Sequence, residues 1–391
     1  MPFPAAHSDS AETVIVGMSG GVDSAVAALL LQQAGFSVQG LYMSNWDDDD
    51  DAYCTAAEDF QDARAVCETL AIPLHRVSFA SEYRERVFAR FLSEYAAGRT
   101  PNPDVLCNRE IKFGVCLDYM HRLGAERIAT GHYARLEQGP GGPRLLKARD
   151  ASKDQSYFLH GVAPKALANT LFPIGELGKD EVRHRAHAAG LRVFDKPDST
   201  GICFIGERPF EDFLSRYLKD SRGPIETPEG RRLGEHRGLA FYTLGQRSGL
   251  GVGGKSGAAD APWYVADKDA SRNALIVVQD HEHPLLMSDG FDVEELHWLA
   301  PPGAAQFECA VKTRYRQGDL ACSVLVRADD DRAQVALRRP ARAVTPGQYA
   351  VFYDGDVCLG GGVIAARHNS SSDASRAGRL VANSLFSLEG S

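Results

Sequence analysis

The residues best suited to chemistry stand in the segment "SGGVDS", directly after a predicted strand. Its adjacent glycines, Gly20 and Gly21, let backbone N–H groups approach an oxyanion closely, and the N-terminus of a following helix attracts negative charge. Ser19 and Ser24 add hydroxyl donors, and Asp23 is suited to hold a Mg²⁺ ion that accompanies phosphate. The segment is not a Walker A loop, because no GK[ST] closes it, and it does not have the GxGxxG pattern of a dinucleotide fingerprint. It therefore predicts another kind of phosphate-binding loop, the alternative being an ordinary glycine-rich turn.

Two of the eight cysteines lie in polar, turn-rich surroundings rather than in apolar strands. In "NPDVLCNREIKFG", Asp104 is expected to cap a helix and Cys107 to lie in its first turn, where a thiolate is favoured. Cys203 lies in "DSTGICFIGERPF". A carboxylate raises the pKa of a nearby thiol, so Asp104 is either a general base or simply the helix cap. From the residues alone, both cysteines are as easily structural as catalytic.

The remaining cysteines fit a structural role, because cysteine is among the most commonly buried residues. They are Cys54, Cys67, Cys116, Cys309, Cys322 and Cys358. No CxxC pair occurs, which argues against a structural zinc site and against a secreted disulfide framework.

Composition limits the class of protein. With 391 residues, 44% hydrophobic and 24% charged, the chain is expected to form two or three soluble domains. No segment is apolar enough to span a bilayer, and the N-terminus does not read as a secretory signal, so we expect a cytoplasmic protein. The net charge of -9 disfavours a nucleic-acid partner on average, but basic clusters such as "VKTRYRQG" and "LRRPARAV" allow a positive face.

The elements that must position these residues alternate in type through the first half of the chain. Strand patterns such as "TVIVGM" and "SVQGLYM" alternate with helical patterns such as "DSAVAALLLQQAG". This order predicts an α/β domain whose mostly parallel sheet is covered on both faces and binds ligands at the carboxyl ends of its strands.

After about Asp220 the pattern changes to turn-rich segments and short strands, which predict a small β-barrel at the C-terminal end. We expect an α/β domain over residues 1–220, a small, mostly β central domain over 221–285 and a C-terminal β-barrel over 286–368. The polar residues 369–391 are expected to form a disordered tail.

The glycine-rich loop resembles the pyrophosphate loop (PP-loop) of ATP pyrophosphatases, a superfamily also described as adenine nucleotide alpha-hydrolase-like. Further motifs narrow the resemblance to the bacterial tRNA-specific 2-thiouridylases of the MnmA type, from Thr13 to about Ala366. In chain order these motifs are "GMSGGVDSAVAALLL", "NWDDDDDAYCTAAEDFQDARAVC", "NPDVLCNREIKFG", "ATGHYAR", "KDQSYFL", "DSTGICFIGERPFEDFL" and "FYTLGQRSGLGVGG". The resemblance implies a PP-loop catalytic domain and a barrel that binds tRNA.

The resemblance also implies a reaction. ATP, with Mg²⁺, adenylates the C2 oxygen of the wobble uridine in a tRNA anticodon. Sulfur carried as a persulfide on Cys203 then replaces that oxygen with the help of the nucleophile Cys107, giving 2-thiouridine, AMP and pyrophosphate. The implied partners are tRNA and a sulfur donor, either a sulfur-relay protein or a cysteine desulfurase.

Site residues follow from the same motifs. The implied ATP-binding residues are Gly17, Met18, Ser19, Gly20, Gly21, Val22, Asp23, Ser24, Met43 and Gly131. Asn102, Pro103 and Asp104 are implied to lie beside the target base. The implied tRNA-binding residues are His132, Lys153, Asp154, Gln155, Arg314, Tyr315 and Gln348.

Two other functions are compatible with the loop. One is another PP-loop enzyme, such as an ATP-dependent amide or C–N ligase of the argininosuccinate synthase or NAD/GMP synthase type. The other is a non-catalytic protein that binds nucleotide or RNA. Neither gives Cys107 and Cys203 a role, so the thiouridylase prediction is preferred.

Overall fold

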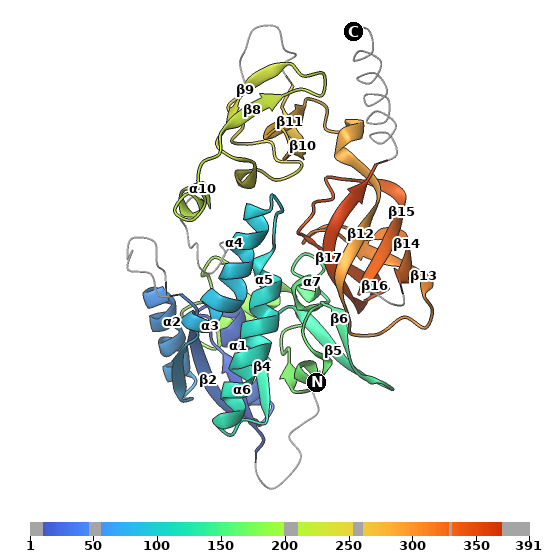
Figure 1. Cartoon of the computed structure of the whole chain (residues 1–391). Helices are drawn as coiled ribbons and strands as arrows, with labels where there is room; N and C mark the ends of the chain where they lie inside the picture. The colour runs from blue at the N-terminus through green and yellow to red at the C-terminus, as the bar shows by residue number, and fades with distance from the viewer. Residues whose placement is uncertain (1–10, 47–55, 199–209, 253–260, 328–330, 370–391) are drawn as a thin grey trace, which may run out of the picture.

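The computed structural model describes residues 11–46, 56–198, 210–252, 261–327 and 331–369 (Figure 1). The first domain is built on a five-stranded sheet in the order β3-β2-β1-β4-β7, in which every neighbouring pair is parallel. Its strands are β1 (Thr13–Gly17), β2 (Ser37–Ser44), β3 (Leu74–Ser78), β4 (Arg127–Thr130) and β7 (Thr170–Leu171). This arrangement confirms the predicted parallel sheet.

Helices cover both faces of this sheet. Alternate residues of β1 belong to different cores: Val14 and Val16 pack with helices α1, α2 and α9, whereas Ile15 packs with the helices between β3 and β4. The helices of this domain are α1 (Val22–Gln33), α2 (Ala56–Thr69), α3 (Ala80–Tyr83), the π-helical η2 (Arg84–Phe88), α4 (Ala89–Ala96), α5 (Pro103–Leu106), the π-helical η3 (Cys107–Val115), α6 (Cys116–Arg122), α7 (Ser156–Leu159), α8 (Pro164–Ala168) and α9 (Lys179–Ala188).

The middle domain contains a four-stranded sheet in the order β10-β11-β8-β9, drawn at the top of Figure 1. Its elements are α10 (Phe210–Leu214), β8 (Gly223–Glu226), β9 (Arg232–His236), the 3₁₀ turn η4 (Leu239–Phe241), β10 (Tyr264–Asp269) and β11 (Ala274–Val278). Helix α4 runs up towards this domain, and buried Ile225, Val265 and Leu275 join the same apolar core as the helices of the first domain.

The last domain is a closed barrel of six antiparallel strands, because β12 pairs with both β15 and β17. After the 3₁₀ turn η5 (Pro284–Leu286) come β12 (Met287–Trp298), β13 (Gln306–Lys312), β14 (Leu320–Arg327), β15 (Arg332–Arg342), β16 (Tyr349–Asp354) and β17 (Val357–His368). Phe291, Val324 and Phe352 fill its interior. This confirms the predicted C-terminal barrel, and the three parts together confirm the predicted fold class.

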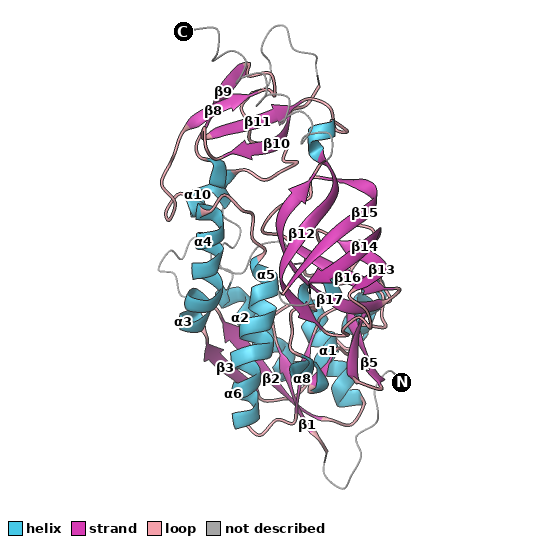
Figure 2. Cartoon of the chain, turned by 45° about the vertical axis from the view of Figure 1, so that its right-hand side comes forward, coloured by secondary structure: helices cyan, strands magenta, loops and turns pink. Residues whose placement is uncertain are grey.

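One feature was not predicted. Strands β5 (Ala134–Gly139) and β6 (Gly142–Lys147) form a hairpin that leaves the first domain beside the barrel (Figure 1, Figure 2). Leu146 of β6 pairs with Val357 of β17, so the hairpin joins the barrel sheet. The exact domain boundaries stay predictions. Asn369, the first residue of the predicted tail, is buried and donates to Pro284 O and Met287 O, both at 2.7 Å. Within the described ranges, no helix combines the length and apolarity needed to cross a bilayer.

Candidate active site

The glycine-rich loop closes around the N-terminus of α1. Gly20 has φ +77°, and a Cβ there would lie 2.3 Å from Asp59 O, so only glycine fits. Gly21 is extended and directly precedes the helix, while the hydroxyls of Ser19 and Ser24 lie 3.2 Å apart. Backbone amides, hydroxyls and the helix N-terminus therefore gather at one point, as an oxyanion site requires.

The end of β4 is pressed against this loop. A Cβ at Gly131 would lie only 2.6 Å from Ser24 N, so the glycine permits the close approach. Met18 is buried at the end of β1, and its N–H donates to Leu41 O of β2 at 2.8 Å, two residues before the half-buried Met43. The structure thus gathers the predicted ATP-binding residues at the carboxyl edge of the sheet.

A network of charges surrounds Asp23. Lys179 Nζ donates to its two carboxylate oxygens at 2.8 and 2.9 Å, and Tyr133 Oη donates at 2.8 Å. Lys179 also lies 2.6 Å from Asp198, which pairs with Lys153 at 2.7 Å. Burial alone would raise the pKa of Asp198, but the two lysines outweigh burial and lower it. The loop is thereby tied to the chain just before residue 199.

A second lysine supports the loop from the other side. Lys196 Nζ donates to Gly20 O at 3.2 Å, to Asp59 at 2.8 Å and to Asp62 at 2.5 Å. Burial lowers the pKa of Lys196, but the hydrogen bonds to Asp59 and Asp62 outweigh it and raise the pKa, so the ammonium stays charged. Neither Lys179 nor Lys196 is predicted from the sequence, since neither belongs to a motif with a known spacing.

The prediction that Asp104 caps the helix leading to Cys107 is wrong. The cap is Asn102, whose side-chain oxygen accepts Asp104 N–H at 3.1 Å, and Pro103 occupies the first helical position. Proline suits that position because its φ is already helical and it has no N–H to satisfy, so the cap moves to the residue before it. Burial raises the pKa of Asp104 although Lys112 opposes the shift, which makes its carboxylate a stronger base than usual.

Cys107 is the first residue of the π-helical segment η3, just beyond the first helical turn rather than within it. Its side chain is 2% exposed and packs in the apolar core of the first domain. π-Helical turns are rare and are frequent at functional sites. Cys203 lies outside the described residues, so its approach to Cys107 stays a prediction.

The Cys107 helix and the phosphate loop meet at the end of β4. His132 lies beside Phe113 of η3, with ring centroids 6.0 Å apart, while its neighbour Gly131 touches Ser24. Thr130 Oγ1 and His132 Nδ1 are 2.8 Å apart. Burial, with Lys112 nearby, holds the pKa of His132 well below its usual range, so the imidazole is neutral.

Three more of the predicted tRNA-binding residues follow the β5–β6 hairpin. Lys153 pairs with Asp198 as described above. Asp154 is buried and accepts Ala148 N–H and Ser156 N–H, both at 3.1 Å. Gln155 Oε1 accepts the backbone N–H of the residue after His132 at 2.9 Å. In the chain alone, these side chains hold the loop in shape; their contact with tRNA stays a prediction.

The three predicted tRNA-binding residues of the barrel also have partners within the chain. Arg314 donates to Arg342 O and Ala343 O, both at 2.9 Å. The ring of Tyr315 lies 4.4 Å from that of Phe158 in the first domain. Gln348 Nε2 donates to Thr100 O at 2.8 Å, which places it beside the segment that leads to Asn102.

The other described cysteines fit the structural prediction. Burial raises the pKa of Cys67 to about 11 and those of Cys116 and Cys358 to about 12, so these thiols stay protonated. Cys309 and Cys322 face each other across β13 and β14 with sulfur atoms 3.6 Å apart. Cys54 lies outside the described residues.

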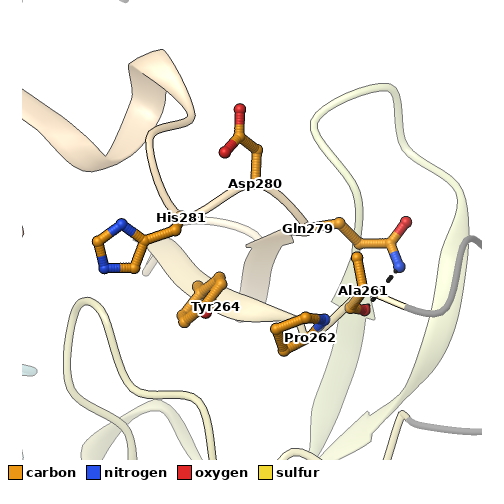
Figure 3. A pocket seen from close by; sticks show the side chains of 6 residues that line it. All are labelled: Ala261, Pro262, Tyr264, Gln279, Asp280 and His281. Carbon is orange, nitrogen blue, oxygen red and sulfur yellow. Dashed lines mark hydrogen bonds between the residues drawn. The ribbon is translucent and has the colours of Figure 1, made fainter.

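A shallow hollow of about 410 Å³ lies on the middle domain (Figure 3). It is lined by Ala261, Pro262, Tyr264, Gln279, Asp280 and His281. These residues carry no predicted role and none belongs to the phosphate loop or the Cys107 helix. Among the residues that the structure describes, no group of three or more His, Cys, Asp or Glu side chains is placed to hold a metal ion.

An oxyanion loop after the first strand of a doubly covered parallel sheet is the arrangement expected of a nucleotide-binding α/β domain of the PP-loop class. The chain matches the family models "tRNA methyl transferase HUP domain" over residues 12–207, "tRNA methyl transferase PRC-barrel domain" over 211–279 and "Aminomethyltransferase beta-barrel domain" over 288–364.

Two curated relatives have the same name and match nearly the whole chain. The tRNA-specific 2-thiouridylase MnmA of Chromohalobacter salexigens is 58% identical over 369 residues, which cover 94% of this chain and 96% of the relative. That of Yersinia enterocolitica is 56% identical over 363 residues, or 92% of this chain and 97% of the relative. The chain therefore belongs to the tRNA-specific 2-thiouridylase family, which confirms the resemblance found in the sequence.

A solved structure of low similarity was also found. The U34-tRNA thiolase NcsA of Methanococcus maripaludis, with its [4Fe-4S] cluster, is 17% identical, with a TM-score of 0.33 over 51% of this chain and 64% of that one.

Proposed function

We propose that the chain uses ATP to replace the C2 oxygen of the wobble uridine in a tRNA anticodon with sulfur. The observation that carries this proposal is the meeting of two segments at the end of β4: the phosphate loop touches Gly131 there, and the Cys107 helix touches His132. A nucleotide site and a thiol helix at one strand end are what a reaction that first activates and then thiolates a base needs. The amide or C–N ligase and the non-catalytic binding protein leave the thiol helix without a role.

The first step activates the base. The C2 oxygen of uridine attacks the α-phosphorus of ATP, the bond to the β-phosphate breaks, and pyrophosphate leaves. Asp104 takes the proton that N3 gives up, since its raised pKa suits a general base. Its carboxylate is not used to cap the helix, because the side chain of Asn102 is the cap. Ser19, Gly20, Gly21 and Ser24 bind the phosphates.

A Mg²⁺ ion bound with ATP neutralises phosphate charge. One carboxylate together with phosphate oxygens is a donor set that Mg²⁺ prefers, and Asp23 is the residue that would hold the ion. Lys179 and Tyr133 already donate to this carboxylate, so an ion held there would share it with them.

The second step transfers sulfur. The terminal sulfur of the Cys203 persulfide adds to C2, and N3 is protonated. The Cys107 thiolate then attacks Cys203 Sγ, the persulfide S–S bond breaks, and its electron pair stays with the sulfur on C2. The C2=S bond forms as AMP leaves, and the resulting Cys107–Cys203 disulfide is reduced by a cellular thiol.

The target base has to leave its stack to reach this site, which an unpaired anticodon loop permits. Asn102, Pro103 and Asp104 receive it, and the residues predicted to contact tRNA guide the anticodon arm. A sulfur-relay protein or a cysteine desulfurase loads the persulfide, and the reaction takes place in the cytoplasm.

The test is to incubate the protein with ATP, Mg²⁺, a sulfur source and unmodified tRNA, and to identify the nucleosides by mass. The wild type is expected to form 2-thiouridine. Cys203→Ser is expected to form none yet to keep part of the tRNA-dependent release of AMP, because activation of the base needs no thiol. Cys309→Ser, in the barrel, is the matched control and should thiolate normally. Normal thiolation by Cys203→Ser would refute the two-thiol reaction.

A further inference from the structure

The backbone that leads into the Cys107 helix, residues 98–101, is held by the middle domain. It begins just after α4 ends. Lys268 Nζ of β10 donates to Gly98 O at 3.0 Å, and the hydroxyl of Thr243 lies 3.3 Å from that of Thr100. Lys268 therefore fixes the C-terminal end of α4, where a positive charge also suits the helix dipole.

The barrel holds the same segment from another side. Thr100 N–H donates to Pro346 O at 3.0 Å, and Gln348 Nε2 donates to Thr100 O at 2.8 Å and to Pro101 O at 3.4 Å. Between these two barrel residues, Gly347 has φ +91°, and a Cβ there would lie 2.8 Å from Thr100 N. The barrel loop is thus pressed directly onto the segment.

The connection from this segment to the catalytic residues is short and stiff. Asn102 alone separates Pro101 from Pro103, and prolines restrict both their own φ and the residue before them. A shift of Thr100 is therefore passed to the capping Asn102, and through it to the helix that carries Asp104 and Cys107.

Lys268 is an unusual residue to find in such a place. Burial lowers its pKa to about 8, so the ammonium is held at a cost in solvation. A buried charge is a poor source of stability, because its loss of hydration is only partly repaid by the groups that it meets. The carbonyl of Gly98 is the partner that the ammonium meets there.

We infer that Lys268 and Gln348 are positioning residues, through which the middle domain and the barrel set the place of the Asn102–Cys107 segment. This inference rests on the proposed function and deepens it. The side chain of Gln348, predicted to contact tRNA, already holds Thr100 in the chain alone, so an RNA that engages the barrel acts directly on the backbone of the catalytic segment.

The experiment replaces Lys268 with methionine, which is unbranched, keeps most of the length of the side chain and removes the donor. At saturating tRNA, the single-turnover rates of AMP release and of thiolation are expected to fall roughly tenfold to a hundredfold, because small displacements of catalytic groups are costly. The Kd for tRNA should stay within about twofold, since tRNA contacts are unchanged. Lys268→Arg should restore most of the rate.

A second readout does not need turnover. Cys107 is 2% exposed, and its alkylation by iodoacetamide, mapped by mass, is expected to speed up several-fold in Lys268→Met. Thr243→Val, a milder change at the same junction, should shift both readouts in the same direction to a smaller extent. Lys165→Met removes an exposed lysine and should change neither.

Two outcomes would overturn the inference. One is a lowered melting temperature in Lys268→Met with wild-type rates and wild-type alkylation of Cys107. The other is a raised Kd for tRNA with an unchanged rate, which would make Lys268 an RNA contact. Failure of the wild type to form 2-thiouridine would instead refute the proposed function, and the alkylation rates would still decide the inference.

Discussion

The phosphate loop and the Cys107 helix meet at the end of β4, but their surroundings are opposite in character. The loop is ringed by charged side chains: Lys179 and Lys196 reach four aspartates and a loop carbonyl within 3.2 Å. Cys107 instead lies in the largest apolar core, and the buried imidazole of His132 beside its helix is neutral. One region is built from ion pairs and the other from packing.

The difference matches the chemistry that the proposed function assigns to each region. A triphosphate is highly charged and needs cations and oriented amides, whereas a thiol that handles sulfur has to be kept from adventitious oxidation. Ion pairs rearrange when a charged ligand arrives, but a packed core resists small shifts. We therefore expect substitutions in the loop to affect the use of ATP, and substitutions in the helix to affect the handling of the base and of sulfur.

The largest expected effect is that of Asp104→Asn. If Asp104 is the base, thiolation should fall by roughly 10²- to 10⁴-fold. Activity needs the ionised carboxylate, so it is lost as the pH falls through the pKa of Asp104, which burial raises above the ordinary 3.8. The acidic limb of the kcat/KM profile should be present in the wild type and absent in the variant. Glu110→Gln, on the same helix, is the control, and an unchanged limb in Asp104→Asn would contradict the assignment.

A smaller effect is expected from Gly20→Ala, on the charged side of the comparison. The substitution forces a Cβ to within 2.3 Å of Asp59 O at φ +77°, so the loop must move. We expect kcat/KM for ATP in tRNA-dependent AMP release to fall about 100-fold, since the oxyanion donors are displaced. Gly35→Ala is the matched control: its φ is +90°, but no atom lies within 4 Å of the new Cβ. It should cost about 1 kcal/mol of stability and leave the rate unchanged. Equal rates in the two variants would show that the loop geometry is unimportant.

The two regions were also unequally predictable from the sequence. The loop, its strand and its helix are contiguous, so local rules were enough to find them. Lys196 could not be found in this way, because it reaches Asp59 across 137 residues through tertiary packing alone. The hydrogen bond between Gln348 and Thr100 could not be predicted either, because the two residues are 248 apart in the chain. The Asn102 cap was predictable, since the proline that follows it marks the first position of a helix.

The contact between the first domain and the barrel should be the part most sensitive to mild acid. His160 is 2% exposed, its Nδ1 lies 2.7 Å from Tyr157 O, and its ring lies 5.0 Å from that of Tyr349 in the barrel. A Cβ at Gly361 of β17 would lie 2.8 Å from its Cδ2, so the two domains pack closely around the imidazole.

The smallest effect on turnover is therefore expected from His160→Gln, which should act on stability instead. Burial lowers the pKa of His160 from the ordinary 6.5 to about 4, so between these values the unfolded chain binds a proton that the folded chain does not. Stability is then lost as the pH falls from 6.5 towards 4, and by pH 5 this group alone accounts for about 2 kcal/mol. The measurement is urea unfolding at pH 7.5 and at pH 5. The free energy of unfolding of the wild type should fall between the two, and the fall should be smaller by about 2 kcal/mol in His160→Gln.

The control is His184→Gln, which removes an exposed imidazole and should show the same fall as the wild type. The carboxylates near the loop offer a contrast, because the lowered pKa of Asp198 keeps its ion pairs with Lys153 and Lys179 intact over this range. Equal falls in the wild type and His160→Gln would mean that acid acts first on another part of the molecule, and the contrast between a charged region and a dry one would not extend to stability.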